Sequence, residues 1–205
     1  MLVQVHEASL AVGETTIFEN VSAEFPSRKI SAIVGPSGSG KSSLLAAISG
    51  HRRLTTGKVG FRESNQQEFL DRDEVKIGWV AQGSNSLPRR SAIDNVMIGA
   101  LSRGESLSAA RKQSLAALSS VGLNHRSETL AKNLSGGELQ RLSIARALMM
   151  RSAVLLADEP TANLDKENAR LMTQVLSDLD TPCTIIVATH DGDVQEVADY
   201  CLRLR

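Results

Sequence analysis

The chain has 205 residues, of which 41% are hydrophobic and 22% are charged. That length suits one α/β domain with a smaller inserted lobe, and the composition excludes a disordered chain. Its 23 Lys and Arg residues balance its 23 Asp and Glu residues, and only 3% of residues are aromatic. Neither the net charge nor the aromatic content therefore favours nucleic-acid binding.

No segment of the sequence predicts membrane insertion or export. No apolar run approaches the length that a bilayer-spanning helix needs, and residues 1–7 lack the pattern of a signal peptide. Cys183 and Cys201 lie in apolar, strand-like surroundings, which predicts buried free thiols in a reducing compartment. We therefore expect a cytoplasmic protein that reaches a membrane only through a partner.

The first part of the chain is rich in strand patterns. Alternation of apolar and polar residues predicts strands over 3–5 and 16–25, and an apolar run predicts a third over 30–34. Residues 57–61 predict an edge strand, and residues 76–81 predict another strand that ends at Gln82. The polar segment between them, residues 63–74, is expected to be an exposed loop or a short helix.

The sequence GPSGSGKS at residues 35–42 follows the apolar strand and precedes a helical pattern. Strand, glycine-rich turn and helix form the context of a phosphate-binding loop. Gly35, Gly38 and Gly40 let successive backbone N–H groups point at an anion. Lys41 can reach the β- and γ-phosphates, and the Ser42 hydroxyl can bind Mg²⁺. A glycine-rich surface turn is the weaker alternative.

Residues 83–135 have a different character. A loop over 83–90 leads to helices near 91–101 and 107–121, and Gly122 ends the second helix. One stripe of this helix is expected to face a core, and it comprises Leu107, Ala110, Ser114, Leu115, Leu118 and Val121. No heptad run is sustained, so the segment predicts a helical insertion without a coiled-coil arm.

A second glycine-opened helix start lies at Leu134–Gln140. Ser135, Gly136 and Gly137 precede a helical pattern, so their backbone N–H groups can approach an anion closely. An ordinary helix start with Ser135 as its cap would explain the same residues. The tetrapeptide alone does not decide between these interpretations.

Two acidic residues follow a continuous apolar run. Residues 153–157 predict a strand that is buried on both faces of a parallel sheet, and Asp158 and Glu159 lie just beyond its carboxyl end. Asp158 suits a Mg²⁺ ligand, and Glu159 suits polarising a water that attacks the γ-phosphate. A pair of helix-capping acids is the alternative.

In the last part of the chain, a buried strand is again followed by polar residues just beyond its carboxyl end. Residues 166–179 predict a charged helix, and residues 183–188 predict a buried strand that leads to His190. A histidine at that edge can donate a hydrogen bond to a γ-phosphate oxygen. A helix near 191–198 and a strand over 200–204 are expected to complete the domain.

In this order the motifs resemble the nucleotide-binding domains of ABC ATPases along the whole chain. The matching motifs are the Walker A loop at 35–42, the Q-loop Gln82, the signature LSGGE at 134–138, the Walker B run ending in Asp158 and Glu159, the D-loop at 162–165 and the switch histidine His190. The resemblance implies an α/β P-loop NTPase core of mainly parallel sheet with an N-terminal antiparallel β subdomain. It also implies one domain over 1–205, with the core at about 1–82 and 150–205 and a helical insertion at about 83–149.

The resemblance also implies ATP and Mg²⁺ as cofactors and a second copy of the chain as partner. ATP would lie between the Walker A loop of one copy and the signature of the other, and Asp165 would contact the opposite copy. Glu159, His190, Lys41 and Gln82 would be catalytic, and Ser42, Gln82 and Asp158 would bind the metal. The implied nucleotide contacts are Gly35, Pro36, Ser37, Gly38, Ser39, Gly40, Lys41, Ser42, Ser43, Val12, Ser135, Gly136, Gly137 and Glu138.

The sequence departs from the family pattern at two positions. The family usually places an aromatic residue after the first strand to stack on adenine, and the corresponding position falls near Val12, where no aromatic residue lies. We expect weaker base contacts there, and we expect the change Val12→Tyr to tighten ATP binding. Glu138 stands where Gln is more frequent, and a carboxylate at a helix start is favourable.

The sequences DEPTANLD and ATHDGDVQEVADYCLRLR look similar to the small ATPases of lipoprotein-releasing, macrolide-export, heme-efflux and cell-division transporters. The resemblance therefore implies integral-membrane permease partners, a location on the inner face of the cell membrane, and no nucleic-acid partner. A soluble ABC-type ATPase acting on nucleic acid or ribosomes is the alternative, but residues 43–133 contain no coiled coil and the chain holds one such domain. A nonhydrolytic binding module is disfavoured by the presence of Lys41, Asp158, Glu159 and His190.

Overall fold

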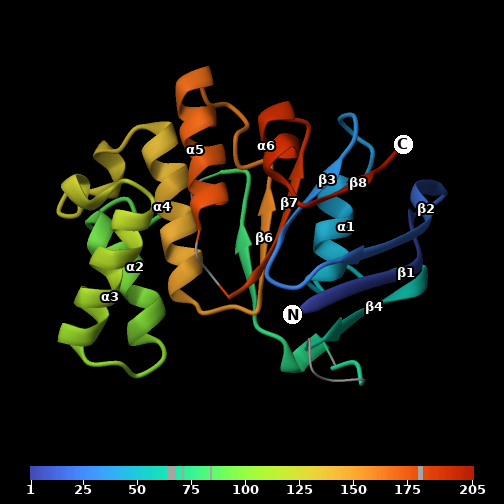
Figure 1. Cartoon of the computed structure of the whole chain (residues 1–205), viewed down its shortest axis with the longest axis horizontal. Coiled ribbons are helices and arrows are strands. Elements are labelled where there is room, and N and C mark those ends of the chain that lie inside the picture. The colour runs from blue at the N-terminus through green and yellow to red at the C-terminus, as the bar shows by residue number, and fades with distance from the viewer. Residues whose placement is uncertain (64–67, 71, 84, 180–181) are drawn as a thin grey trace. The chain divides into compact units, whose positions relative to one another are not determined.

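The computed structural model describes residues 1–63, 68–70, 72–83, 85–179 and 182–205. The chain forms two compact units, whose elements are labelled in Figure 1. The first, here called the sheet unit, comprises Met1–Trp79, Ala153–Glu159 and Pro182–Arg205. The second, the helical unit, comprises Val80–Ser152 and Pro160–Thr181.

The helical unit holds more than the insertion expected at about 83–149. It also contains residues 160–181, which the sequence interpretation places with the core. The physical reason is that helix α5 (Lys166–Asp178) packs against helix α4 (Gly136–Met149). Packing between neighbouring helices therefore groups residues that are separate in the sequence.

An antiparallel sheet begins the sheet unit. It contains β1 (Leu2–Val12), β2 (Thr15–Phe25) and β4 (Thr56–Arg62), in the order β2-β1-β4. The register of β1 with β4 shifts between His6 and Ser9. Gly57 lies at this shift with φ of 78°, and a Cβ on it would lie 2.4 Å from the carbonyl oxygen of Glu7. The shift therefore requires glycine at this position.

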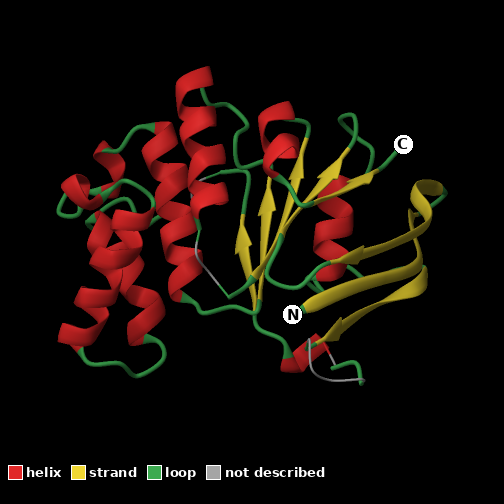
Figure 2. Cartoon of the chain, in the orientation of Figure 1, coloured by secondary structure: helices red, strands yellow, loops and turns green. Residues whose placement is uncertain are grey.

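A five-stranded sheet follows, in the order β5-β6-β7-β3-β8. Its strands are β3 (Ile30–Val34), β5 (Ile77–Val80), β6 (Val154–Asp158), β7 (Thr184–Thr189) and β8 (Tyr200–Arg203). Strand β3 pairs in parallel with β7 and β8, and β6 pairs in parallel with β7. The carboxyl ends of β3, β6 and β7 therefore lie at one edge of this sheet, which Figure 2 shows as adjacent arrows.

One hydrophobic core joins both sheets of this unit. It contains Val3 and Phe61 from the antiparallel sheet, Leu156 and Ile186 from the parallel sheet, and Leu44 from α1 (Lys41–Ile48). Helix α6 (Gly192–Val197) packs near β3, and a short 3₁₀ helix spans Arg72–Glu74. This core holds rigid the strand ends from which the functional side chains project.

The helical unit is built on α2 (Ala92–Leu101), α3 (Leu107–Ser120), α4 and α5. Two 3₁₀ turns, Asn124–Arg126 and Ala131–Asn133, connect α3 to α4. A Cβ on Gly99 of α2 would lie 2.9 Å from the Cβ of Met149 in α4. The two helices therefore approach each other closely at this glycine.

Two details of the sequence interpretation are wrong. Leu107 is 68% exposed because it is the first residue of α3, whereas the stripe residues Ala110, Ser114, Leu118 and Val121 are buried. Cys201 is exposed because β8 is an edge strand and this side chain points away from the core, whereas Cys183 is buried as expected.

Residues 64–67 and 71 of the expected polar segment, and Ser84 of the expected loop, lie outside the described residues. Among the described residues, none of the helices combines the length and the hydropathy that a membrane-spanning segment needs.

Candidate active site

The loop between β3 and α1 has the backbone shape that an anion-binding loop requires. Gly38 and Gly40 have φ of 84° and 89°, in the left-handed region. A Cβ on Gly35 would lie 2.6 Å from Ser39 Oγ and 2.7 Å from the Leu204 carbonyl oxygen, so this position also requires glycine. No side chain caps the N-terminus of α1. The start of this helix therefore keeps its positive dipole end available to an anion.

Lys41 is held over this loop by backbone carbonyls. Its Nζ donates hydrogen bonds to the carbonyl oxygens of Gly35 and Pro36, each at 3.0 Å, and the side chain is only 6% exposed. The same nitrogen lies 3.4 Å from Oε1 of Glu159. The ammonium is thus held at the loop by these carbonyls, and its contact with β- and γ-phosphates stays a prediction.

Glu159 lies just beyond the end of β6 and links Lys41 to His190. Its backbone N–H donates to the Ala188 carbonyl oxygen at 2.8 Å, and its φ is 47°, a strained value for a glutamate. Its Oε2 accepts a hydrogen bond from His190 Nδ1 at 2.9 Å. The Glu159 side chain is 12% exposed and the His190 side chain 68% exposed. A carboxylate held in this way, at the exit of a parallel strand, can accept a proton from water.

Ser42 and Asp158 form a pair that fits a hard divalent cation. The Ser42 hydroxyl donates to Asp158 Oδ1 at 2.8 Å. Burial raises the pKa of Asp158, and the nearby Glu159 adds to this rise, while the hydrogen bond from Ser42 and the charge of Lys41 oppose it. A desolvated carboxylate next to a hydroxyl oxygen is stabilised when a cation binds both, and these are the oxygen ligands that Mg²⁺ prefers.

In the helical unit, the N-terminus of α4 forms a capping box. Ser135 Oγ accepts from the Glu138 N–H at 3.2 Å, and the Glu138 carboxylate accepts from the Ser135 N–H at 2.8 Å and from Arg126 Nε at 2.9 Å. Burial alone would raise the pKa of Glu138, but the hydrogen bonds from Arg126 and Ser135 outweigh it and lower this pKa. Ser135 is therefore a helix cap, and its hydroxyl hydrogen remains available to donate to another acceptor.

Within this unit, the Asn168 side chain lies between Asp165 of the D-loop and Gly137 of the signature. The sequence interpretation missed this residue. Asp165 caps α5 by accepting from the Asn168 N–H at 2.9 Å and from Asn168 Nδ2 at 2.8 Å. Asn168 Oδ1 accepts from Arg141 Nη1 at 3.3 Å. A Cβ on Gly137 would lie 2.4 Å from the same oxygen. An Asp followed three residues later by a helical Asn was the available signal for the cap, but the contact with Gly137 had none.

The remaining predicted site residues lie as follows. Gln82 follows β5, belongs to the helical unit and is exposed. Val12 ends β1, pairs with Thr15 and is 52% exposed. The structure thus brings Lys41, Ser42, Asp158, Glu159 and His190 together in the sheet unit, and it places the signature residues Ser135–Glu138 and Gln82 in the helical unit.

We expect the change Gly137→Ala to lower both stability and ATP hydrolysis. The new methyl group would overlap Asn168 Oδ1, which Asp165 and Arg141 hold in place. Overpacking of this kind costs about 1–3 kcal/mol, and it would tilt the first turn of α4. The free energy of unfolding, measured by urea denaturation, and the hydrolysis rate test this expectation.

A second substitution, at Asn168, distinguishes the steric overlap with Asn168 Oδ1 from any other effect of the added methyl group. Asn168→Ala removes the overlapping oxygen, so the double variant Gly137→Ala/Asn168→Ala should lose less stability than the two single losses added together. Strict additivity of the two losses would contradict the proposed contact.

The sheet unit, with its glycine-rich loop, its lysine and its two carboxylates at the carboxyl end of β6, defines a P-loop nucleoside-triphosphate hydrolase. The sequence profile of the family described as "ABC transporter" matches residues 18–162. The chain belongs to this family and is an ABC transporter ATP-binding subunit with ATPase activity.

Curated relatives extend over almost the whole chain. It is 34% identical over 195 residues to the lipoprotein-releasing system ATP-binding protein LolD of Desulfotalea psychrophila, which covers 92% of this chain and 87% of that protein. It is 36% identical over 214 residues to the uncharacterized ABC transporter ATP-binding protein YbbA of Escherichia coli (strain K12), covering 99% of this chain and 94% of that protein.

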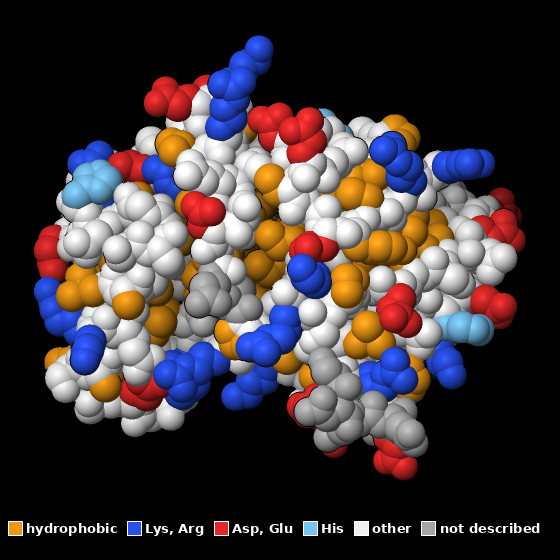
Figure 3. Space-filling view, in the orientation of Figure 1, with side chains coloured by type: hydrophobic (Ala, Val, Ile, Leu, Met, Phe, Trp, Pro, Cys, Tyr) orange, Lys and Arg blue, Asp and Glu red, His pale blue; other side chains and the backbone are white. Residues whose placement is uncertain are grey.

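A solved structure agrees with the fold. The ATP-binding cassette MJ0796, in a dimeric post-hydrolysis state bound to ADP and Pi, superposes with a TM-score of 0.82 at 30% sequence identity. This similarity covers 99% of the present chain and 94% of the other chain. These findings support a membrane-transporter ATPase over a soluble ATPase acting on nucleic acid or ribosomes. Figure 3 shows both Lys and Arg and Asp and Glu side chains on the visible surface of each unit.

Proposed function

We propose that two copies of this chain close head to tail around two molecules of ATP, with Mg²⁺, and power an integral-membrane permease. The two units together act as one ATPase domain. Each ATP lies between the Walker A loop of one copy and the Ser135–Gly137 segment of the other. Hydrolysis then releases the two copies from each other.

The observation that carries this proposal is a second helix start that opens with glycines. Helix α1 begins at the phosphate loop without a side-chain cap. Helix α4 begins at Gly136 and Gly137, and Ser135 Oγ accepts from the Glu138 N–H, which leaves the hydroxyl able to donate to an anion. A triphosphate carries enough charge and oxygen atoms to occupy both starts. The dimeric, ADP- and Pi-bound state of MJ0796 supports this arrangement in a relative.

The chemistry follows from the residues of the sheet unit. Ser42 and Asp158 would hold Mg²⁺, with Gln82 as a further ligand, and the bound ion would neutralise charge on the phosphate oxygens. Glu159 accepts the proton of the water that attacks the γ-phosphorus. His190 orients this carboxylate through Nδ1. A hydrogen bond from its Nε2 to a γ-phosphate oxygen would then require the doubly protonated ring.

The names of the relatives support the choice of membrane partner. LolD is named as the ATP-binding protein of a lipoprotein-releasing system, and we propose that this chain drives a permease of the same general kind, in an exporter or a system that transmits mechanical work across the membrane. The chain would sit on the inner face of the cell membrane through that permease. Asp165, besides capping α5, would contact the opposite copy.

A mixing experiment tests the composite site. Lys41→Ala disables the Walker A loop, and Ser135→Asp places a carboxylate where the γ-phosphate should lie while keeping a good helix cap. In a head-to-tail pair formed from one copy of each variant, one site combines both defects and the other is intact. We therefore expect the mixture to hydrolyse ATP although neither variant does so alone.

The control for the second variant is Ser135→Asn, which caps a helix equally well but adds no charge. This variant should retain ATP-dependent pairing when its mass is measured by light scattering, at twice the 22.0 kDa of one chain. A mixture that stays as inactive as its components would show that each site is built within one copy, and it would contradict the head-to-tail arrangement.

A further inference from the structure

Resting on the proposed function, we propose that Arg126 is a positioning residue of the composite nucleotide site. It binds the Glu138 carboxylate, cancels its charge and holds it in the capping box, so that the phosphates of the ATP held by the opposite copy can approach the start of α4. Arg126 does this through Glu138 and contacts no nucleotide itself. A carboxylate can therefore stand at a helix start that has to accept an anion.

Glu138 places a negative charge close to the N–H groups that an anion would contact. Burial would raise the pKa of this carboxyl, but the hydrogen bonds from Arg126 and Ser135 lower it, so it is ionised at neutral pH. Its Oε2 accepts from the Ser135 N–H at 2.8 Å, which puts Oε2 within about 7 Å of the backbone nitrogen of Gly136, the next residue. Two like charges at about 7 Å weaken binding by about 5- to 50-fold, depending on salt. An uncompensated Glu138 would thus oppose anion binding at α4.

The Arg126 guanidinium provides the compensation. Its Nε donates to Glu138 Oε1 at 2.9 Å, while Oε2 of the same carboxylate accepts from Ser135. The Glu138 side chain is 13% exposed and the Arg126 side chain 42% exposed, so water screens the pair only in part. Among the described residues this is the only ion pair of Glu138, because Arg141, one turn further along α4, donates to Asn168 instead. Both carboxylate oxygens are thus engaged, and the charge pair is neutral.

The backbone of Arg126 is fixed by the segment that carries it. Arg126 ends the 3₁₀ turn Asn124–Arg126, where its N–H donates to the carbonyl oxygen of the buried Leu123 at 2.9 Å. Its own carbonyl oxygen accepts from the Thr129 N–H at 2.9 Å, and the Thr129 carbonyl oxygen accepts from the Ala92 N–H, at the start of α2, at 2.9 Å. The guanidinium therefore reaches α4 from a segment that is tied to α2. A positioning residue needs such support.

The same arrangement leaves two backbone donors for an anion. The Glu138 carboxylate satisfies the Ser135 N–H, and Ser135 Oγ satisfies the Glu138 N–H at 3.2 Å. Gly136 and Gly137 lie between them at the first positions of α4, where backbone N–H groups have no partner within the helix. A phosphate can approach these two groups once the charge of Glu138 is cancelled.

The first test measures ATP-dependent pairing in the Glu159→Gln chain, with Mg²⁺, by light scattering over a range of chain concentrations. Arg126→Met removes the charge and the donor but keeps the length of the side chain. We expect it to weaken pairing by about 5- to 50-fold, and the loss should shrink as salt is raised. In the chain with wild-type Glu159, the KM for ATP should rise by a similar factor while kcat at saturating ATP stays within about threefold.

Rescue at Glu138 separates a charge effect from a structural one. Glu138→Gln keeps an acceptor for the Ser135 N–H but removes the charge, so Arg126→Met/Glu138→Gln should pair within about twofold of Glu138→Gln alone. If Arg126 only fastened the 3₁₀ turn to α4, the double variant would pair as poorly as Arg126→Met. Arg126→Lys, which keeps the charge, should restore most of the pairing. Arg111→Met is the matched control, because it removes an exposed arginine that pairs with Glu128 at 2.6 Å in the same unit, and it should pair like the parent chain.

A second measurement does not depend on pairing. In the Lys41→Ala chain, which lacks the ammonium of the Walker A loop, inorganic tripolyphosphate should shift the backbone amide resonances of Gly136 and Gly137. Adding Arg126→Met should weaken this binding by about fivefold or more. Adding Glu138→Gln to that variant should restore it.

The outcomes distinguish the role of Arg126 from the proposed function. If Glu159→Gln fails to pair in ATP, the proposed function is contradicted, and the amide titration still decides the role of Arg126. If it pairs and Arg126→Met pairs equally well, Arg126 has no positioning role. Failure of Glu138→Gln to rescue Arg126→Met would overturn the inference as well, and so would tripolyphosphate that leaves both glycine amides unmoved.

Discussion

The Glu159→Gln variant is expected to bind ATP and to hydrolyse it about 10²- to 10⁴-fold more slowly than the wild type, the usual effect of losing a general base. Glutamine has nearly the same shape, but its amide oxygen cannot take a proton from water at neutral pH. The hydrogen bond from His190 Nδ1, at 2.9 Å in the wild type, can still reach the amide oxygen. Binding is therefore preserved while proton transfer is lost.

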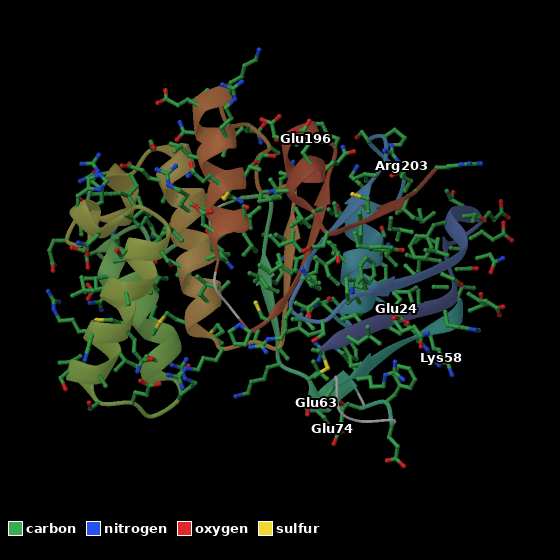
Figure 4. The ribbon with its side chains drawn as sticks, viewed as in Figure 1. Glu24, Lys58, Glu63, Glu74, Glu196 and Arg203 are labelled. Carbon is green, nitrogen blue, oxygen red and sulfur yellow. The ribbon has the colours of Figure 1, made fainter. Side chains whose placement is uncertain are left out.

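With Mg²⁺ and ATP this variant should accumulate as a nucleotide-bound pair of chains. Single-turnover hydrolysis and light scattering measure the two effects separately. The matched control is Glu196→Gln, which makes the same change at an exposed position on α6 that Figure 4 labels. It should hydrolyse ATP at the wild-type rate. Rapid turnover by Glu159→Gln would refute Glu159 as the base.

The second large effect is expected for Lys41→Ala. Its ammonium donates to the Gly35 and Pro36 carbonyls at 3.0 Å and lies 3.4 Å from Glu159, so it is held where the β- and γ-phosphates would bind. A hydrogen bond to a charged group contributes about 1.5–3 kcal/mol. Its removal should weaken ATP binding by about 10- to 100-fold and abolish measurable hydrolysis.

Calorimetric titration with ATP and a steady-state phosphate assay measure these two losses. Lys58→Ala is the control, because it removes the same charge from an exposed position on β4, also labelled in Figure 4. Its affinity should match that of the wild type. ATP affinity of Lys41→Ala within about twofold of wild type would contradict the role of this lysine in holding the phosphates.

The two variants are physically coupled. Oε1 of Glu159 lies 3.4 Å from the Lys41 ammonium in the structure. A phosphate that binds Lys41 therefore competes with the Glu159 carboxylate for this ammonium. In Glu159→Gln this competition is absent. We therefore expect Glu159→Gln to bind ADP, which lacks the γ-phosphate, at least as tightly as the wild type does.

Much of the parallel sheet and its loop could be predicted from local sequence. Continuous apolar runs identify β3, β6 and β7, because strands buried on both faces have no polar alternation. Gly38 and Gly40 adopt positive φ. The phosphate loop was recognisable because its backbone requires glycine at such positions. Ser135 and Glu138 form the capping box, which the position of Ser135 before a helical pattern had suggested.

Long-range contacts could not be predicted in the same way. The grouping of α5 with the helical unit, the exposure of Leu107 and the exposure of Cys201 depend on which elements pack together, and periodicity within one segment does not specify its neighbours. The contact of Gly137 with Asn168 has the same origin, because it joins residues of two different helices.

The sequence by itself determined the glycine-rich loop, the order of the motifs and the residue types of the candidate catalytic groups, because each depends on residue types at short spacing. Only the tertiary structure decided that Glu159 lies between Lys41 and His190, that Ser42 contacts Asp158, and that Phe18 is buried in the core beside the phosphate loop. The reason is physical. Such placements arise from the parallel pairing of β3, β6 and β7 and from the packing of one shared core, which bring together residues more than 100 positions apart in the chain.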